Sequence, residues 1–447
     1  MTLHRSPLLT ALLLSCLCLT AGCASHADRL HQFRSDFFAG NLDQATTEID
    51  ELIEKSKEDA DVLKLDRAVV ELVSGRPENA ERLLREVRDR FDYLEQTSAA
   101  ELAASMVTDD TAIAYAGEDH EKILILSLLA LSNLMADGTD ATAYSLQIAE
   151  KQRQLIEAAG GEEEHPELAE RQVALGPYIH AALQEETFTN PDDVVRSRTM
   201  VVEWQPDFRD GKADLERAKY EAHSKPGHGV VYVFTLVGRG PTKEESLEVP
   251  TQAALLIADQ IISHNASQSL PPTVAPIRVP KVVTRENRIQ EVSVRVDDAA
   301  AGSTATIVDV GELARVHYEA KYPAVIGRAV ARRVLKKSAV YTVKEHVNAD
   351  ASPVADVALT LAGIAWEATE TPDTRCWGLL PDEIQVLRLE LPAGPHKLTL
   401  QPADARGPFG QPASVGVNVR DGHNTYVLAN FPDNRLVGQI LTSEEVE

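Results

Sequence analysis

The sequence is poor in cysteine and in aromatic residues. It has four cysteines in 447 residues, and two of them, Cys16 and Cys18, fall in an apolar N-terminal segment. This excludes a fold that depends on a framework of disulfides, and a chain of this length buries a core without one. Aromatic residues make up 5% of the chain. With Ala and Leu plentiful, we expect much of the core to be helical.

Positive charge is also scarce. The chain has 44 Lys and Arg against 69 Asp and Glu, a formal net charge of −25. General nucleic-acid binding needs a basic footprint, so this composition excludes it.

The sequence also lacks motifs for metals, cofactors and nucleotides. It contains no His-Glu-x-x-His, no Gly-x-Ser-x-Gly and no paired Cys for zinc. Gly238–Lys243 follows a strand-like run, but Pro241 removes a backbone donor and no Gly precedes Lys243. A phosphate-binding loop needs both features, so we predict no nucleotide and no cofactor.

The N-terminus reads as an export signal. The apolar run from Pro7 to Leu19 has 13 residues, fewer than the ~20 that span a bilayer. It ends in Leu19-Thr20-Ala21-Gly22-Cys23, which resembles the lipobox of bacterial lipoproteins. We therefore expect a signal peptide over 1–22 and lipidation of Cys23. The alternative is an ordinary cleaved signal with a chance cysteine.

The lipobox also predicts a location. A short membrane-proximal linker over 23–29 would join the lipid to the fold. Ala24 stands where an Asp would retain a lipoprotein in the inner membrane, by resemblance to bacterial lipoprotein sorting. We expect a lipid-anchored envelope protein on the periplasmic face of the outer membrane.

The N-terminal half contains a recurring turn followed by a helical pattern. In each copy a Gly ends one helix and an Ala five residues later begins the packed face of the next. The copies run from Gly40 to Ala45, from Gly75 to Ala80 and from Gly138 to Ala143. The first two are 35 residues apart, and the array resembles tetratricopeptide repeats, whose period is about 34. We predict such repeats over 30–225; a plain helical bundle is the alternative.

Beyond the repeats, 226–372 is predicted to mix strands and helices. Val230–Val237 is a nearly continuous apolar run rich in β-branched and aromatic residues, as in a buried strand. Asp309 is predicted to cap a helix with Glu312, and Pro323 to begin the next. The other elements expected here are strands at Val292–Val296 and Ala305–Val308 and a core helix at Pro353–Thr369.

The last segment, 373–447, reads as a small β-sandwich. Asp421-Gly422 is a hairpin-type turn. The five short strands expected are Ile384–Leu391, Lys397–Gln401, Ser414–Val419, Thr425–Ala429 and Leu436–Leu441. The fold class is therefore α+β: helical repeats, a mixed α/β region, and a C-terminal sandwich.

Two groups of residues are candidate sites. Asp373, Arg375, Trp377, Leu380 and Pro381 form a compact motif that is either a partner-binding site or a structural joint in which Trp377 packs and Asp373 pairs with Arg375.

The second group is basic. Arg328, Arg332 and Lys336 follow helical spacing, and Arg333 and Lys337 widen that face. These cations either pair with the protein's own acids or form a basic interaction face for an acidic partner or lipid headgroup.

The order of these features resembles a family of uncharacterised bacterial lipoproteins with a tetratricopeptide-like N-terminal half and a mixed C-terminal half. The likeness rests on Glu118–Lys122, Gly240–Lys243, Arg328–Lys336, Asp373–Pro381 and Leu391–His396. Ser145–Gln147 departs from the family pattern.

We therefore expect a non-enzymatic, membrane-anchored adaptor that acts in cell-envelope or peptidoglycan assembly. It would bind envelope proteins through the helical repeats and the membrane through its lipid. The alternatives are a cell-wall hydrolase, which needs paired carboxylates or a nucleophile–base pair in one cleft, and a purely structural envelope component.

Overall fold

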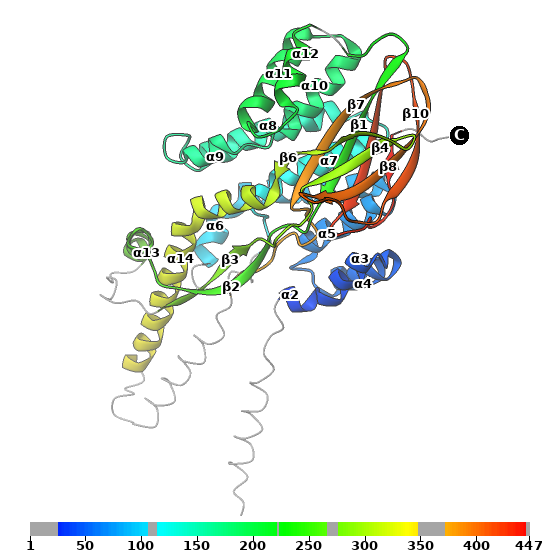
Figure 1. Cartoon of the computed structure of the whole chain (residues 1–447). Helices are drawn as coiled ribbons and strands as arrows, with labels where there is room; N and C mark the ends of the chain where they lie inside the picture. The colour runs from blue at the N-terminus through cyan, green and yellow to red at the C-terminus, as the bar shows by residue number, and fades with distance from the viewer. Residues whose placement is uncertain (1–25, 106–113, 221–222, 266–275, 347–371, 444–447) are drawn as a thin grey trace, which may run out of the picture.

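A computed structural model describes residues 26–105, 114–220, 223–265, 276–346 and 372–443. The N-terminal half is helical and most strands lie in the C-terminal half, as predicted (Figure 1). The helices of the N-terminal half are α2 (His26–Arg29), α3 (His31–Ala39), α4 (Leu42–Lys55), α5 (Ala60–Val73), α6 (Pro77–Ser105), α7 (Asp119–Met135), α8 (Ala141–Ala158), α9 (Pro166–Glu170), α10 (Leu175–Thr187), α11 (Pro191–Trp204) and α12 (Gly211–Ala218).

The remaining elements form three sheets and two further helices. The strands are β1 (His228–Val237), β2 (Thr242–Glu248), β3 (Ile277–Val283), β4 (Glu291–Val296), β5 (Ala299–Ser303), β6 (Ala305–Asp309), β7 (Glu383–Pro392), β8 (Gly394–Asp404), β9 (Gly407–Pro408), β10 (Ala413–Val419), β11 (Asn424–Phe431) and β12 (Leu441–Thr442). The helices are α13 (Gln252–Asn265) and α14 (Val310–His346).

Strand β1 lies at the centre of three layers. The first sheet has the order β12-β11-β1-β7-β6, and the second has the order β10-β8-β4-β5. Tyr232 and Phe234 of β1 pack into the core shared with the helices, whereas Val231 and Val233 pack against the second sheet. Because side chains alternate along a strand, a strand covered on both faces needs an unbroken apolar run. This explains why every residue from Gly229 to Val237 is buried.

The sandwich is larger than the predicted one at 373–447. Its first sheet combines β1 and β6 with β7, β11 and β12, and its second combines β4 and β5 with β8 and β10. Strand β1 pairs antiparallel with β7 and parallel with β11. Strands from 228–309 therefore take part in both sheets. Strands β1 and β6 belong to the first sheet, and β4 and β5 belong to the second. The predicted strand Leu436–Leu441 is reduced to Leu441–Thr442.

The predicted hairpin at Asp421-Gly422 is wrong. The chain does turn there, with Gly422 at φ +75°. However, β10 before the turn belongs to the second sheet, and β11 after it pairs with β1 in the first. The turn is a crossing between sheets, and a local turn signal does not reveal which neighbour the next strand will have.

A long helix extends from the body beside the two-stranded sheet of β2 and β3. Helix α14 runs unbroken from Val310 to His346 with Pro323 inside it, so the predicted second helix beginning at Pro323 is wrong. Its later part packs against α13 and β3 through a separate apolar cluster that includes Ile326 and Val330. This packing offsets the backbone hydrogen bond that a mid-helix proline removes. Asp309 Oδ1 does accept the Glu312 N–H at 2.8 Å, as predicted.

The turns of the helical half agree with two of the three predicted copies. Gly40, Gly75 and Gly138 all have φ between +70° and +82°. Ala45 and Ala80 are fully buried, but Ala143 is exposed. Helix α8 begins three residues after its Gly, whereas α4 and α6 begin two residues after theirs. The extra residue turns α8 by about 100°, so Tyr144 takes the buried position.

Several predicted features lie outside the described residues: the signal segment 1–22, Cys23 and the helix at Pro353–Thr369. In the described part of the chain, no helix combines the length and the apolar character that crossing a bilayer requires.

Because α8 is rotated, Ala143 should tolerate a larger side chain, whereas the corresponding Ala80 of α6 should not. Ala80→Leu should lower the free energy of unfolding by about 1–3 kcal/mol, because a fully buried site has no room for a larger side chain. Ala143→Leu should change it by less than about 0.5 kcal/mol, because the site is exposed. Urea unfolding measures both, and equal losses would contradict the position of α8.

Candidate functional site: a charged junction and the hollows around it

Three segments that the sequence analysis singled out meet at the start of α7. They are Glu118–Lys122, Gly240–Lys243 and Asp373–Pro381, and they are far apart in the sequence. Glu118 Oε1 is 2.6 Å from Lys243 Nζ, and Glu121 Oε1 accepts the Trp377 N–H at 2.6 Å. We call this group, Tyr115, Glu118, Glu121, Lys243, Arg375 and Trp377, the junction.

Glu121 is the acceptor around which the junction is arranged. Its side chain is fully buried, and its Oε2 accepts the Tyr115 hydroxyl at 2.5 Å and the Glu118 N–H at 3.0 Å. Together with the Trp377 N–H, three donors converge on one carboxylate. Glu121 also completes a capping box with Glu118, which satisfies backbone donors at the start of α7. Burial, followed by the nearby Glu118 carboxylate, raises the pKa of Glu121.

Lys243 is a buried cation with an acidic partner. It is 7% exposed and lies 5.6 Å from the centre of the Tyr115 ring. Burial opposes ionisation of Glu118, but the Lys243 ammonium holds the pKa of that carboxyl down at about 2. Helix α14 joins the same region, because Lys321 pairs with Asp119 at 2.6 Å. Lys243, the last residue of the segment considered as a phosphate-binding loop, therefore lies in the interior, where it pairs with Glu118.

The Asp373–Pro381 motif lies in the interior. Asp373 pairs with Arg375 at 2.7 Å, and Trp377 is 0% exposed. Leu380 and Pro381 are also buried. This arrangement favours the structural alternative for the motif, because its central side chains do not reach the surface.

The backbone of this motif forms hydrogen bonds to the helical layer and to the loop after β1. The Leu379 N–H donates to Asp66 Oδ1 of α5 at 2.8 Å, and the Leu380 carbonyl accepts the Gly240 N–H at 2.8 Å. Burial raises the pKa of Asp66 to about 7. The loop before β7 is thus tied to α5, to α7 and to the loop between β1 and β2.

The predicted basic face on α14 is not an open surface. Arg332 is 4% exposed, and Arg333 Nη1 donates to the Pro276 carbonyl at 2.7 Å. Arg328 is half-buried. Lys336 and Lys337 lie within α14, where the structure does not describe their side chains. Burial of Arg332 and the bond from Arg333 to a backbone carbonyl weigh against an open basic face, and whether these cations pair with the protein's own acids stays a prediction.

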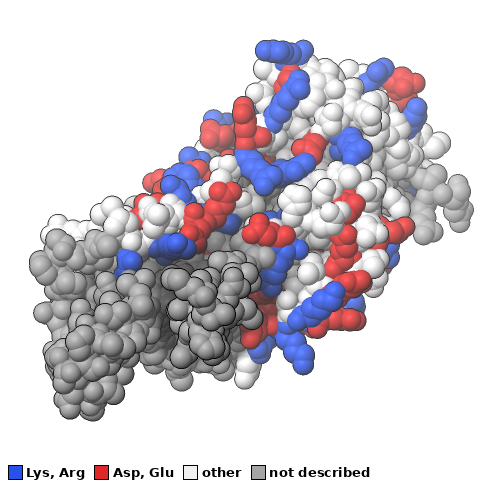
Figure 2. Space-filling model, turned by 90° about the horizontal axis from the view of Figure 1, so that it is seen from below, with Lys and Arg blue, Asp and Glu red and all other residues white. Residues whose placement is uncertain are grey.

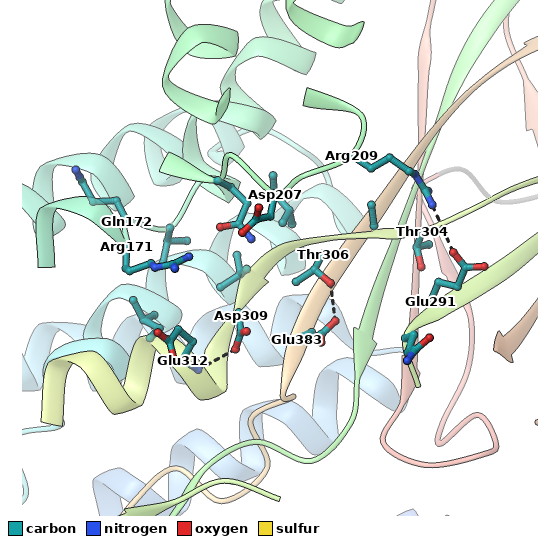
Figure 3. Close-up of a pocket in the computed structure, with 17 residues that line it drawn as sticks. Arg171, Gln172, Asp207, Arg209, Glu291, Thr304, Thr306, Asp309, Glu312 and Glu383 are labelled. Carbon is teal, nitrogen blue, oxygen red and sulfur yellow. Dashed lines mark hydrogen bonds and ion pairs between the residues drawn. The ribbon is translucent and has the colours of Figure 1, made fainter. Parts of the chain in front are cut away.

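A hollow of about 370 Å³ opens between the helical layer and the sandwich (Figure 3). Four of its five carboxylates are engaged by neighbours. Glu383 accepts the Thr306 hydroxyl at 2.6 Å, Glu291 accepts the Ser303 hydroxyl at 2.7 Å, and Glu312 pairs with Arg315 at 2.6 Å. Asp309 caps α14. These acids organise the joint between β6, β7 and α14, and we assign no reaction to them.

A second hollow, of about 640 Å³, lies on the helical layer between α6 and the turn that leads into α8. Six carboxylates and two arginines line it. At its buried edge, Glu81 accepts the Tyr144 hydroxyl at 2.8 Å. The lining residues that carry charge are Glu78, Glu81, Glu86, Asp89, Asp137, Asp140, Arg82 and Arg85. We call it the acidic hollow; its lining has a formal charge of −4. On the face in Figure 2, by contrast, acidic and basic side chains are interspersed.

In the described part of the chain, no group of three or more His, Cys, Asp or Glu is placed to hold a metal ion. Comparison with protein-family models, with curated proteins and with solved structures finds no match.

Sequence reasoning missed two members of this region. Tyr115 and Asp66 carry no motif. Tyr115 acquires its role from Glu121, six residues later in α7, and Asp66 acquires its role from Leu379, 313 residues away. Asp66 gave no clear signal, because α5 also carries Lys64, Arg67 and Glu71, and only the structure shows that Asp66 is fully buried and needs a partner.

Glu121→Gln should destabilise the protein by about 1–3 kcal/mol. A glutamine has one acceptor oxygen for three donors, so a backbone N–H will face the amide NH₂ and remain unsatisfied. Tyr115→Phe is the matched control: it removes one donor and leaves two N–H groups for two oxygens, so its loss should be smaller. Urea unfolding compares them, and a larger loss for Tyr115→Phe would contradict this account.

Asp382→Asn should change how stability depends on pH. Burial, with smaller contributions from Glu383 and Asp309, raises the pKa of Asp382 from 3.8 to about 7. The folded state therefore favours the protonated acid, and its stability is lost as pH rises through that value. Asparagine stays neutral, so the Tm of the variant relative to wild type should rise between about pH 4 and about pH 8. A constant difference would contradict the prediction.

Proposed function

We propose that this protein is a non-enzymatic, lipid-anchored adaptor of the bacterial cell envelope. Cys23 carries the lipid, and the helical half, a divergent tetratricopeptide-like array, binds a protein partner in cell-envelope or peptidoglycan assembly. The protein would lie on the periplasmic face of the outer membrane.

The observation that carries this proposal is how close to Cys23 the described fold comes. His26, three residues after Cys23, already belongs to α2, and its side chain is 7% exposed. The expected linker over 23–29 is therefore shorter, because 26–29 are already helical. Three extended residues reach about 10 Å, so a lipid on Cys23 holds the body directly at the membrane surface.

The acidic hollow is the best-supported partner surface. It lies on helices of the proposed repeat array, and its lining of −4 suits a partner segment rich in Lys or Arg. The net charge of −25 would attract such a partner from a distance. Electrostatic steering of this kind raises the association rate and weakens as salt screens the charges.

Charge substitutions test this surface better than a deletion. The helical layer and the first sheet share one core, in which Leu129 and Phe234 both take part. Removing 30–220 would expose that core and unfold the rest. Glu78, Asp89 and Asp140 line the acidic hollow and are exposed, so they can be changed without opening the core.

Glu78→Gln, Asp89→Asn and Asp140→Asn together should reduce partner cross-linking in intact envelopes at least several-fold. The control, Glu162→Gln, Glu163→Gln and Glu164→Gln, removes the same charge from an exposed turn outside the hollow. Cross-links are quantified by mass spectrometry at low and high salt. The mass of the N-terminal peptide is measured in the same preparation.

Equal cross-linking by the two triple variants would overturn the acidic hollow as the docking surface. An unmodified N-terminus at Ala24, or an unacylated Cys23, would overturn the lipid anchor. The two outcomes are independent, so one part of the proposal can fail while the other stands.

A further inference from the structure

The largest of the hollows described here, about 1210 Å³, is lined by arginines in a strongly acidic protein. It is formed by α2 and α3, the loop after β1, the segment before β4 and two loops of the sandwich. Its arginines are Arg34, Arg239, Arg285, Arg288 and Arg435. We call it the arginine hollow.

Three of these guanidinium groups are held in place by the fold. Arg239 stacks on Phe38 at 3.8 Å and pairs with Asp433 at 2.5 Å. Arg435 Nη2 donates to the Ala39 carbonyl at 2.8 Å, at the end of α3. Arg288 lies over Phe409 at 4.1 Å. Stacking and hydrogen bonding fix the planes of these groups before any ligand arrives, which lowers the entropy lost on binding.

Of the other two, Arg285 has capacity left for an anion, because its side chain is exposed at the hollow. Arg34 lines the hollow, but its Nε and Nη2 are buried against Gly378, and its charge opposes the rise in pKa that burial causes at the Asp66 carboxyl. Arg34 therefore adds positive charge beneath the hollow, while Arg285 supplies exposed donors for an anionic oxygen.

The charge balance of this hollow is opposite to that of the protein. Among the lining residues, five arginines face three acids, Asp28, Glu286 and Asp433, which leaves a formal charge of +2; beside the lining, Asp404 pairs with Arg288 at 3.0 Å. The acidic hollow carries −4 and the whole chain −25. Phosphate groups are the usual ligands of clustered arginines, because the planar guanidinium donates two parallel hydrogen bonds to their oxygens.

The position of the arginine hollow relative to Cys23 selects the source of the phosphate. Ala27 and Asp28 line the hollow, and Ala27 is four residues after Cys23. Four extended residues span at most about 14 Å. This step rests on the proposed lipid anchor, which would bring the hollow to the level of the lipid headgroups.

We propose that the arginine hollow binds the phosphate headgroup of an anionic membrane lipid. Bound there, the headgroup would fix the orientation of the body on the bilayer. The acidic hollow on α6–α8 would then stay available to a partner, because it is a separate surface with the opposite charge.

Vesicle binding of the mature chain, 23–447, prepared without acylation, tests this proposal. It should bind vesicles of phosphatidylcholine mixed with phosphatidylglycerol and not vesicles of phosphatidylcholine alone. Arg285→Gln with Arg288→Gln should weaken that binding roughly 10- to 30-fold, as expected for two basic side chains at an anionic surface. Raised salt should weaken it further for wild type.

Arg153→Gln with Arg196→Gln is the control, since both side chains are exposed and lie outside the arginine hollow. It should bind anionic vesicles as wild type does, and thermal melting should show all three proteins folded. Equal binding by the two double variants would overturn the proposal. So would saturation of the hollow by inorganic phosphate or glycerol phosphate with no binding to vesicles, which would assign a free phosphate as the ligand.

The absence of acyl groups separates this test from that of the anchor. Failure to bind anionic vesicles removes the headgroup site and leaves lipidation of Cys23 untouched. An unmodified N-terminus in the envelope removes the anchor, while vesicle binding would still report on the arginine hollow.

Discussion

The carboxylate of Glu121 is the interaction on which the arrangement of layers depends. It accepts hydrogen bonds from the Tyr115 hydroxyl, the Glu118 N–H and the Trp377 N–H, and it is fully buried. These bonds start α7 and hold the loop before β7 against it. Because β7 pairs with β1, the same contact fixes the central sheet against the helices. A buried carboxylate with three donors has one satisfactory geometry, so it specifies how the two halves meet.

Charge in the interior and charge on the surface have different roles. Inside, Lys243 pairs with Glu118, and Arg198, which is 0% exposed, pairs with Glu185 at 3.0 Å. Such pairs do not add much net stability, but losing one partner is costly, so they specify the native packing. On the surface, the acidic hollow and the arginine hollow are separate. This separation would let one chain meet a basic protein partner and an anionic bilayer at the same time.

Local signals in the sequence predicted local structure well. The run at Val230–Val237 predicted a buried strand, and Gly40 and Gly75 predicted left-handed turns before helices with a buried Ala. The predictions failed where a neighbour decided the outcome. Ala143 is exposed because one extra residue rotates α8, and the turn at Asp421-Gly422 joins two sheets. Pro323 lies within α14 because α13 and β3 support that helix.

The sequence by itself determined that helices form the N-terminal half and that most strands lie in the C-terminal half, as well as the excess of acid and the motif residues of the candidate site. These depend on spacing and composition, which act over a few residues. Only the tertiary structure decided that Glu118, Lys243 and Trp377 meet, and that five arginines from four segments line one hollow. Partners separated by more than one hundred residues are selected by packing of the whole chain, because side-chain ion pairs and hydrogen bonds depend on distance in space and not on distance in sequence.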